Sequence, residues 1–291
     1  TPWEDGLTLR SGSQSVDLST TTIDGLDHLI VTANSTGTTV SLGAITLGDG
    51  AASGGAGSLA VTAGLAALYG SISTAGDTTG IAGTLNLNSA VQLGRDVTLT
   101  TNATTTDQSI SLNFAVDADA AAQLRLLTID AGGGDFTATA AIGGTQALGA
   151  LVVASAHNVT LASVTTTGNS LTNTIDIGSV SAVNNVTLTG DLLTNSGTDA
   201  GGIRLNASKV LVDVASGAGT VRLATDASNG DGAITLVGTP TISSVTAWND
   251  GLTIASGSQS VDLSGATIDQ LDHLVITTAS TGPSVKLGSV T

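Results

Sequence analysis

Aspartates gathered in short loops are the residues of this chain whose type and spacing suit chemistry, and that chemistry is calcium binding. Three loops each hold a pair of them: Asp117 with Asp119, Asp130 with Asp135, and Asp226 with Asp231. Carboxylate and backbone carbonyl oxygens are the ligands that Ca²⁺ prefers. The alternative is that these aspartates close turns, and the absence of consecutive Gly-Gly-x-Gly-x-Asp nonapeptides favours it. We therefore predict no cofactor, with Ca²⁺ at these pairs as the hypothesis that stays open.

Histidines are the other side chains that could hold a metal ion. The chain has three, His28, His157 and His273, and the first follows two nearby carboxylates, Asp24 and Asp27. Such a group offers oxygen and nitrogen ligands in principle. We prefer the interpretation that Asp27 and His28 close a turn before the apolar run that follows, and that His157 does the same. No metal site is predicted at the histidines.

Enzymes with known signatures are a poor match to this sequence. A β-helical enzyme acting on polysaccharide needs paired carboxylates held at a fixed separation, together with aromatic platforms for sugar rings. Only five aromatic and seven basic residues are present, and none of them cluster. Neither a Gly-x-Ser-x-Gly elbow with triad partners nor a phosphate-binding glycine-rich loop with Lys occurs. The prediction is no catalytic residue and no enzyme.

Two tryptophans open the two copies of a long internal repeat. Residues 3–46 return as residues 248–291 at an offset of 245 without a gap, and 29 of 44 positions are identical. Trp3 and Trp248 begin the copies, which predicts a bulky plug at the junction between repeat units; a repeated sugar-stacking site is the alternative. Long self-similarity is typical of arrays in which each unit leans on its neighbours. We divide the chain into one full period, 1–245, and the start of the next, 246–291, which repeats 1–46.

Composition and charge narrow the class of partner. The formal net charge is −16, and the seven basic residues are scattered singly, which argues against nucleic acid and anionic membranes. No run of about 18 apolar residues is present, so no membrane insertion is predicted. Cysteine and methionine are both absent, so backbone ladders and packing must supply the stability.

Short runs with period-2 alternation recur along the chain and predict an all-β fold. Val, Ile and Leu alternate with Ser, Thr and Asn in these runs, and Gly, Asn and Asp punctuate them. The clearest runs are 16–19, 28–32, 39–42, 58–62, 83–88, 96–100, 109–114 and 124–129. Only residues 118–123, which are rich in Ala, suggest a short turn or helix. Since aromatics are 2% of residues, the core must be narrow and aliphatic.

The spacing of similar runs predicts a parallel β-solenoid, the right-handed β-helix. The run from Asn158 to Leu161 is echoed from Asn185 to Leu188, and Val186 is in turn followed by a looser echo at Val221. Both spacings suit one coil each. One period would then hold on the order of eight coils and advance roughly 40 Å. Tandem β-sandwich domains are the alternative architecture.

One segment resembles a known family. The run Phe136-Thr137-Ala138-Thr139-Ala140-Ala141-Ile142-Gly143-Gly144-Thr145-Gln146-Ala147-Leu148-Gly149-Ala150-Leu151-Val152-Val153-Ala154, followed by Asn158-Val159-Thr160-Leu161, resembles the coil repeats of filamentous-haemagglutinin-type adhesins. The similarity is clearest over about residues 130–240. The resemblance implies a β-helical bacterial exoprotein.

These patterns together predict a structural protein. The expected role is a segment of a repetitive extracellular bacterial fibre, sheath or adhesin shaft, located at the cell surface or secreted. Its partners would be neighbouring copies of itself, and surface glycans as a further class. The alternatives are a carbohydrate-binding or calcium-binding adhesin module and, less favoured, a β-helical enzyme that degrades polysaccharide.

Overall fold

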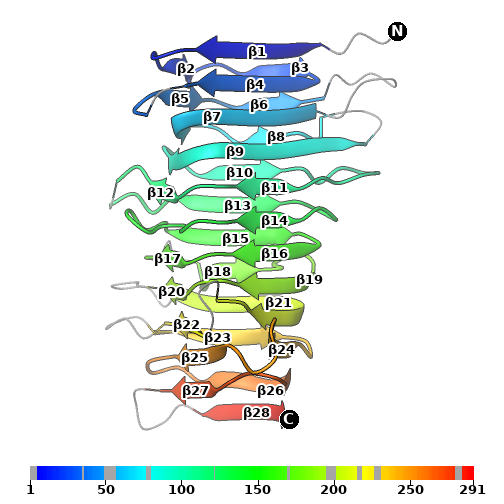
Figure 1. The fold of residues 1–291 in the computed structure, drawn as a ribbon, viewed down its shortest axis with the longest axis vertical. Helices are drawn as coiled ribbons and strands as arrows, with labels where there is room; N and C mark the ends of the chain where they lie inside the picture. The colour runs from blue at the N-terminus through cyan, green and yellow to red at the C-terminus, as the bar shows by residue number, and fades with distance from the viewer. Residues whose placement is uncertain are drawn as a thin grey trace.

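The protein is a parallel β-solenoid of about ten turns, seen in a computed structural model. The structure describes residues 5–34, 36–48, 57–76, 80–120, 122–168, 171–194, 201–214, 218–225, 231–278 and 284–291. Figure 1 shows the strands stacked along the long axis, with the N-terminus at one end and the C-terminus at the other. Every strand pairing among the described residues is parallel, from β1 with β4 to β26 with β28.

Each turn of the coil has three faces, which we call A, B and C in chain order. Face A consists of β1 (Gly6–Ser11), β4 (His28–Ala33), β11 (Ile110–Leu112), β14 (Phe136–Ala138), β16 (Asn158–Leu161), β19 (Val183–Leu188) and β24 (Thr241–Ser244). Face B consists of β2 (Val16–Leu18), β5 (Thr39–Leu42), β12 (Val116–Ala118), β17 (Val164–Thr166), β20 (Leu192–Thr194), β22 (Thr220–Ala224), β25 (Gly251–Ala255) and β27 (Leu274–Thr277). Face C consists of β3 (Ile23–Leu26), β6 (Ile45–Leu47), β8 (Ile72–Ser73), β10 (Val97–Thr100), β13 (Leu126–Asp130), β15 (Ala150–Ser155), β18 (Asn173–Ile177) and β23 (Asp231–Val237).

Five strands cross a corner and belong to two faces. β7 (Gly57–Leu68) and β9 (Ala82–Leu93) run from face A to face B, whereas β21 (Gly201–Val212), β26 (Val261–Ile268) and β28 (Val285–Val290) run from face C to face A. In β7 the register shifts between Thr62 and Leu65, where the strand bends round the corner. Such irregularities let one strand change direction without losing its hydrogen bonds on either face.

The core is one continuous stack of aliphatic side chains inside the coil. Alternation along each strand sends every second residue inward, so that Leu29 and Val31 are fully buried while Ile30 between them is 37% exposed. On face A the buried residues Ile110, Phe136 and Val159 lie one above another in consecutive turns. One hydrophobic cluster includes both Val31 near the start and Ile268 near the end.

The all-β parallel solenoid predicted from sequence is confirmed, and the sandwich alternative is wrong for the described residues, since sandwiches pair their strands antiparallel. The right-handed sense of the coil stays a prediction. No helix occurs in the part of the chain that the structure describes; near residues 118–123 the N–H of Gln123 donates to the carbonyl of Ala120 in a turn, with a distance of 3.0 Å.

One predicted coil length is confirmed and the other is wrong. Val159 pairs with Val186, as the sequence echo predicts. Val186, however, pairs with Val210, and Val221 lies on face B against Leu252. Because the strand β21 was missed, the predicted coils were too long and too few. Turns of face A also vary in length: the shortest runs from Leu7 to Leu29 and the longest from Val210 to Ile242.

The two copies of the internal repeat fold in the same local way. Leu7 pairs with Leu29, and their equivalents Leu252 and Leu274 pair with each other. Gly6 lies under the ring of His28, where a Cβ would come 1.8 Å from the imidazole, and Gly251 lies under His273 in the same manner. The described core runs through residue 245 without a break, so the division into 1–245 and 246–291 remains a prediction about sequence repetition.

Phe136 is the aromatic side chain in the core, with 0% of its surface exposed, and it offers a test of this packing. We expect Phe136→Ala to lower the free energy of unfolding by about 3–5 kcal/mol, because the neighbouring coils cannot collapse into the space that the ring leaves. Phe114, which is 52% exposed, is the matched control. Phe114→Ala should change stability by less than about 0.5 kcal/mol in the same urea titration. Equal effects of the two substitutions would contradict the assigned core.

Candidate functional site

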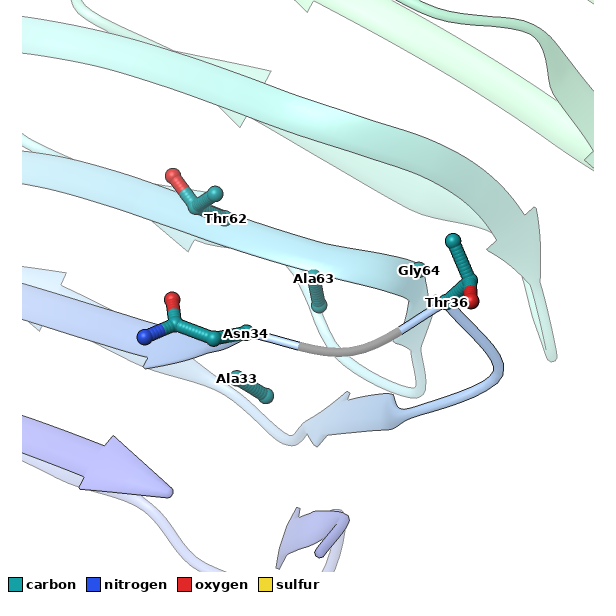
Figure 2. A pocket seen from close by; sticks show the side chains of 6 residues that line it. All are labelled: Ala33, Asn34, Thr36, Thr62, Ala63 and Gly64. Atoms are coloured by element: carbon teal, nitrogen blue, oxygen red, sulfur yellow. The ribbon is translucent and has the colours of Figure 1, made fainter. Parts of the chain in front are cut away.

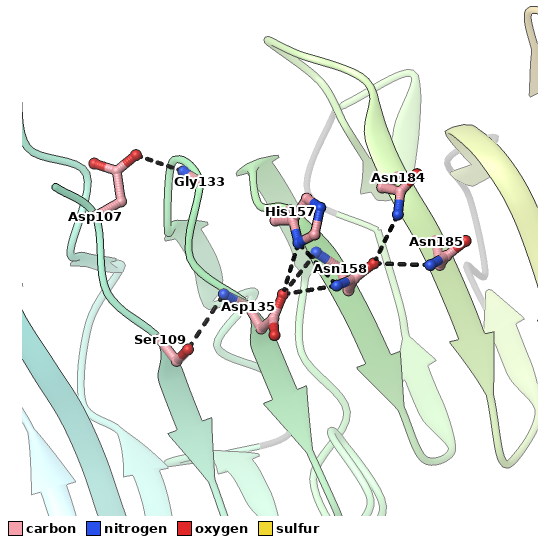
Figure 3. Close-up of polar contacts among 8 residues, drawn as sticks. All are labelled: Asp107, Ser109, Gly133, Asp135, His157, Asn158, Asn184 and Asn185. Carbon is pink, nitrogen blue, oxygen red and sulfur yellow. Dashed lines mark hydrogen bonds and ion pairs between the residues drawn. The ribbon is translucent and has the colours of Figure 1, made fainter. Parts of the chain in front are cut away.

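A column of hydrogen-bonded polar side chains runs along the corner that precedes face A (Figure 3). Four of its members lie one position before a buried residue of that face: Ser109, Asp135, Asn158 and Asn185. The N–H of Asp135 donates to Oγ of Ser109 at 3.3 Å, and Oδ1 of Asp135 accepts from both N and Nδ2 of Asn158 at 3.0 and 2.9 Å. Oδ1 of Asn158 then accepts from Nδ2 of Asn184 and Asn185, at 3.3 and 2.9 Å. We call these residues the polar column.

His157 flanks the polar column without completing a reactive group. Its Nδ1 lies 3.5 Å from Oδ1 of Asp135 and 2.9 Å from Nδ2 of Asn158, and its side chain is 56% exposed. A general base needs a substrate pocket or a nucleophile within hydrogen-bond reach. The contacts recorded for His157, with Asp135 and Asn158, include no nucleophile. The turn interpretation of this histidine is therefore the simpler account.

The predicted aspartate pairs act separately, each as an acceptor for a nearby group. Oδ1 of Asp117 accepts from the N–H groups of Thr145 and Gln146 at 2.9 and 3.0 Å, in the next coil. Both oxygens of Asp119 accept from the guanidinium of Arg125 at 2.8 Å, and this hydrogen bond lowers the pKa of Asp119 below its usual 3.8. The two carboxylates of this loop thus have different partners.

The second pair also faces different partners, and the third is only partly described. Oδ1 of Asp130 accepts from Nδ2 of Asn102 at 2.9 Å and from Oγ of Ser155, whereas Asp135 belongs to the polar column. Asp226 lies outside the described residues, and Asp231 is described only as the first residue of β23. Among the residues that the structure covers, no three His, Asp or Glu side chains come together to hold a metal ion.

Several further aspartates have a role that sequence reasoning missed: they tie one coil to the next. Oδ2 of Asp107 accepts from the N–H of Gly133 at 2.5 Å (Figure 3). Asp96 accepts from the N–H of Leu126, and Asp191 from that of Arg222, in each case one coil further along the chain. Carboxylate acceptors make stronger hydrogen bonds to backbone donors than neutral groups do. The sequence signal for such a bond is an Asp placed one coil before the residue whose N–H it accepts. This spacing can be recognised only when the coil length is known.

The N-terminal histidine group is likewise structural. Asp27 is 3% exposed, and its Oδ2 accepts from the N–H of Asp5 at 3.1 Å, while Oδ1 has no partner among the described atoms. At the equivalent position of the second copy, Nδ1 of His273 lies 2.8 Å from Oδ2 of Asp272. The same repeat position is thus buried in one copy and paired at the surface in the other, which does not suit a fixed metal site.

A shallow depression of about 250 Å³ lies where the coil turns after β4 and at the bend of β7 (Figure 2). Its lining is small and uncharged: Ala33, Asn34, Thr36, Thr62, Ala63 and Gly64. Ligand sites usually enclose about 300–1,000 Å³ and place a few polar groups convergently. This depression holds no titratable side chain and gives no support to catalysis.

Trp248 lies on the outside of the corner between β24 and β25. Its residue is 62% exposed. The role of Trp3 and Trp248 as a plug between repeat units stays a prediction. Its backbone has φ of 63°, and its N–H donates to the carbonyl of Gln270 at 2.9 Å. Left-handed backbone is uncommon for a bulky residue and marks a position held by its surroundings. Trp3 lies outside the described residues.

Comparison of the chain with known protein families, with curated proteins and with solved structures finds no match. The described residues include no helix long and apolar enough to cross a membrane.

The two copies of the repeat share one short carboxylate motif. Oδ1 of Asp262 accepts from N and Oγ of Ser264 at 3.0 and 2.6 Å, and Oδ2 accepts from Nζ of Lys286 at 3.1 Å. The equivalent Asp17 accepts from the N–H of Ser19 at 2.9 Å. The serine hydrogen bonds, and then the lysine, lower the pKa of Asp262 from 3.8 to about 2. Ser19 lowers the pKa of Asp17 in the same direction.

This motif predicts a shift in one carboxyl titration, measurable by NMR. Ser264→Ala should raise the pKa of Asp262 from about 2 towards 3.8, because it removes the hydroxyl hydrogen bond that is the largest single cause of the lowered pKa, while the N–H of residue 264 still donates. Lys286→Ser is the matched control, since the first copy has Ser41 at that position. Because folding lowers this pKa, any stabilisation from Asp262 is present above pH 3.8 and is lost as the pH falls through about 2. An unchanged pKa of Asp262 in the serine variant would contradict the assignment.

Proposed function

We propose that the chain is a structural segment of a repetitive extracellular bacterial fibre, sheath or adhesin shaft. The observation that supports this most is the unbroken stack of buried aliphatic residues over about ten turns, joined by parallel strand pairing from end to end. A parallel β-solenoid is the arrangement of a structural repeat protein, in which stability is spread along the axis. A fibre needs length and stiffness, and both come from this stacking.

The outer surface of the solenoid is suited to contact with water, and its charge opposes side-by-side association with other copies of the chain. The net charge of −16 keeps like surfaces apart, and aspartates such as Asp107 and Asp191 are bonded to the next coil. The depression beside Ala63 is lined by no titratable group, and the contacts recorded for the exposed His157 are with Asp135 and Asn158. These features favour a mechanical role over an enzymatic one, and the similarity to filamentous-haemagglutinin-type coils points to the same class of protein.

The experiment that tests this role is immunogold electron microscopy on intact cells of the source organism. Antibodies raised against this chain should label thin fibres or a layer outside the cell envelope. The control is the same antibody after absorption with the purified chain, which should remove the label. Label confined to the interior of sectioned cells, with none on intact cells, would overturn the proposal.

A second candidate function, glycan binding at Trp248, is favoured by the exposure of that side chain. Indole faces are common platforms for sugar rings because they are broad, apolar and rigid. The residue lies at a corner, where its main-chain N–H donates to the carbonyl of Gln270 and its backbone is left-handed. Exposed Phe114 occupies a similar corner five turns earlier on face A, counted from Ile110 to Ile242.

Glycan arrays separate these two candidates. If Trp248 binds sugar, the chain should bind a defined group of glycans, and Trp248→Ala should abolish that binding with no change in the unfolding curve. Phe114→Ala is the matched control for loss of an exposed aromatic ring. If the unaltered chain binds no glycan, or if both variants lose binding equally, glycan binding at Trp248 is rejected and the structural role remains.

A further inference from the structure

Some equivalent residues of the two repeat copies are buried in one copy and exposed in the other. The difference depends on whether a further coil covers them along the axis. In the second copy Leu252 is 1% exposed, because β25 pairs with β22 before it and with β27 after it. In the first copy the equivalent Leu7 is 37% exposed, and among the described residues β1 pairs only with β4. One side of the first coil therefore presents core residues to solvent.

At the opposite end of the solenoid, residues of the second copy are exposed while their equivalents in the first copy are buried. Val40 and Leu42 in the first copy are fully buried, because β7 lies against β5. Their equivalents in the second copy, Val285 and Leu287, are 43% and 50% exposed, and the described strands place only β26 against β28. The apolar edge of β27 and β28 is thus the same surface that β7 and β8 cover in the first copy.

The strand register of the second copy matches that of the first. Val16 pairs with Val40, and their equivalents Val261 and Val285 pair with each other. The next pair, Ile23 with Ile45, likewise has its equivalent in Ile268 with Val290.

The second copy, however, does not lie on the same faces as the first. Leu7 lies on face A. When the paired residues of that face are followed from one turn to the next, Ile242 is reached nine turns after Leu7. The equivalent Leu252 comes after Ile242, on face B, where it pairs with Val221. The later strands agree, since Val261 lies on face C whereas Val16 lies on face B. One period of the repeat therefore spans nine turns and one further face.

We propose that the exposed edge of β27 and β28 is a docking surface for the coil of a further copy of this repeat, with successive copies rotated by one face. This rests on the proposed function of the chain as part of an array. The occupant is a coil with the sequence of residues 57–76, which covers the equivalent edge of the first copy. Equivalent residues return to the same face after three copies, and each copy advances about 45 Å along the axis.

Extension of the chain tests the docking surface. Thr291 is the equivalent of Thr46, so a chain carrying the sequence of residues 47–76 after Thr291 should cover the edge. Amide exchange in β27 and β28 should slow by at least about tenfold relative to the unextended chain. The matched control is the same extension with Asp at the equivalents of Leu59 and Val61, which should give no added protection. Unchanged exchange with the unaltered extension, or equal protection with the control, overturns the docking surface.

Distance measurements between spin labels test the rotation in the chain as it is, which has no cysteine of its own. Gln14 and Ala247 are exposed and lie at corners between faces A and B, whereas exposed Gln259, the equivalent of Gln14, lies at a corner between faces B and C. Labels at Gln14→Cys and Ala247→Cys should be closer than labels at Gln14→Cys and Gln259→Cys. The reverse order would mean a whole number of turns per period and would overturn the rotation. Neither result depends on where the protein is found in the cell.

Discussion

Main-chain hydrogen bonding between successive coils is the interaction on which the rest of this structure depends. In a parallel solenoid each strand donates and accepts along the axis, so the partners of one turn are always supplied by the turns before and after it. The pairing of β4 with β1 on one side and with β7 on the other is the repeating case. Buried aliphatic side chains fill the space inside these ladders, and aspartates at the corners bond to the following coil.

Aliphatic side chains fill the interior of the solenoid, and their packing contributes to its stability. With no cysteine, the chain has no covalent links between coils, and its stability comes from backbone ladders and dense packing. Phe136 occupies one level of face A between Ile110 and Val159, which shows that the lumen accepts one ring where its neighbours are aliphatic. At the corners, aspartates bonded to amides of the following coil satisfy donors that the strands leave unpaired.

Much of the fold could be predicted from sequence, because alternation and repetition are local signals. The pairing of Val159 with Val186 followed from a run of similar residues one coil apart. The bent strands were harder to find: β21 crosses a corner without the turn-forming cluster of Gly, Asn and Asp that usually marks one. That one omission lengthened the predicted coils and placed Val221 on the wrong face.

The side-chain roles were less predictable, for a physical reason. The bonding of Asp117 to the backbone of Thr145 and Gln146 depends on which residues lie one turn away, and turn lengths vary along the chain. Exposure of Trp248 depends on the path of its corner, which no periodicity records. Sequence patterns identified most of the ladders, whereas contacts across a corner depend on the three-dimensional path of the chain.

Variation in turn length has a consequence of its own. The turn from Leu7 to Leu29 is much shorter than the turn from Val210 to Ile242, yet the residues at both ends of each turn stay in register. Extra residues are therefore accommodated in the corners, outside the ladders. Corner segments can therefore diverge or lengthen while the strands of the solenoid keep their register, so the fold separates a constant support from a variable outer surface.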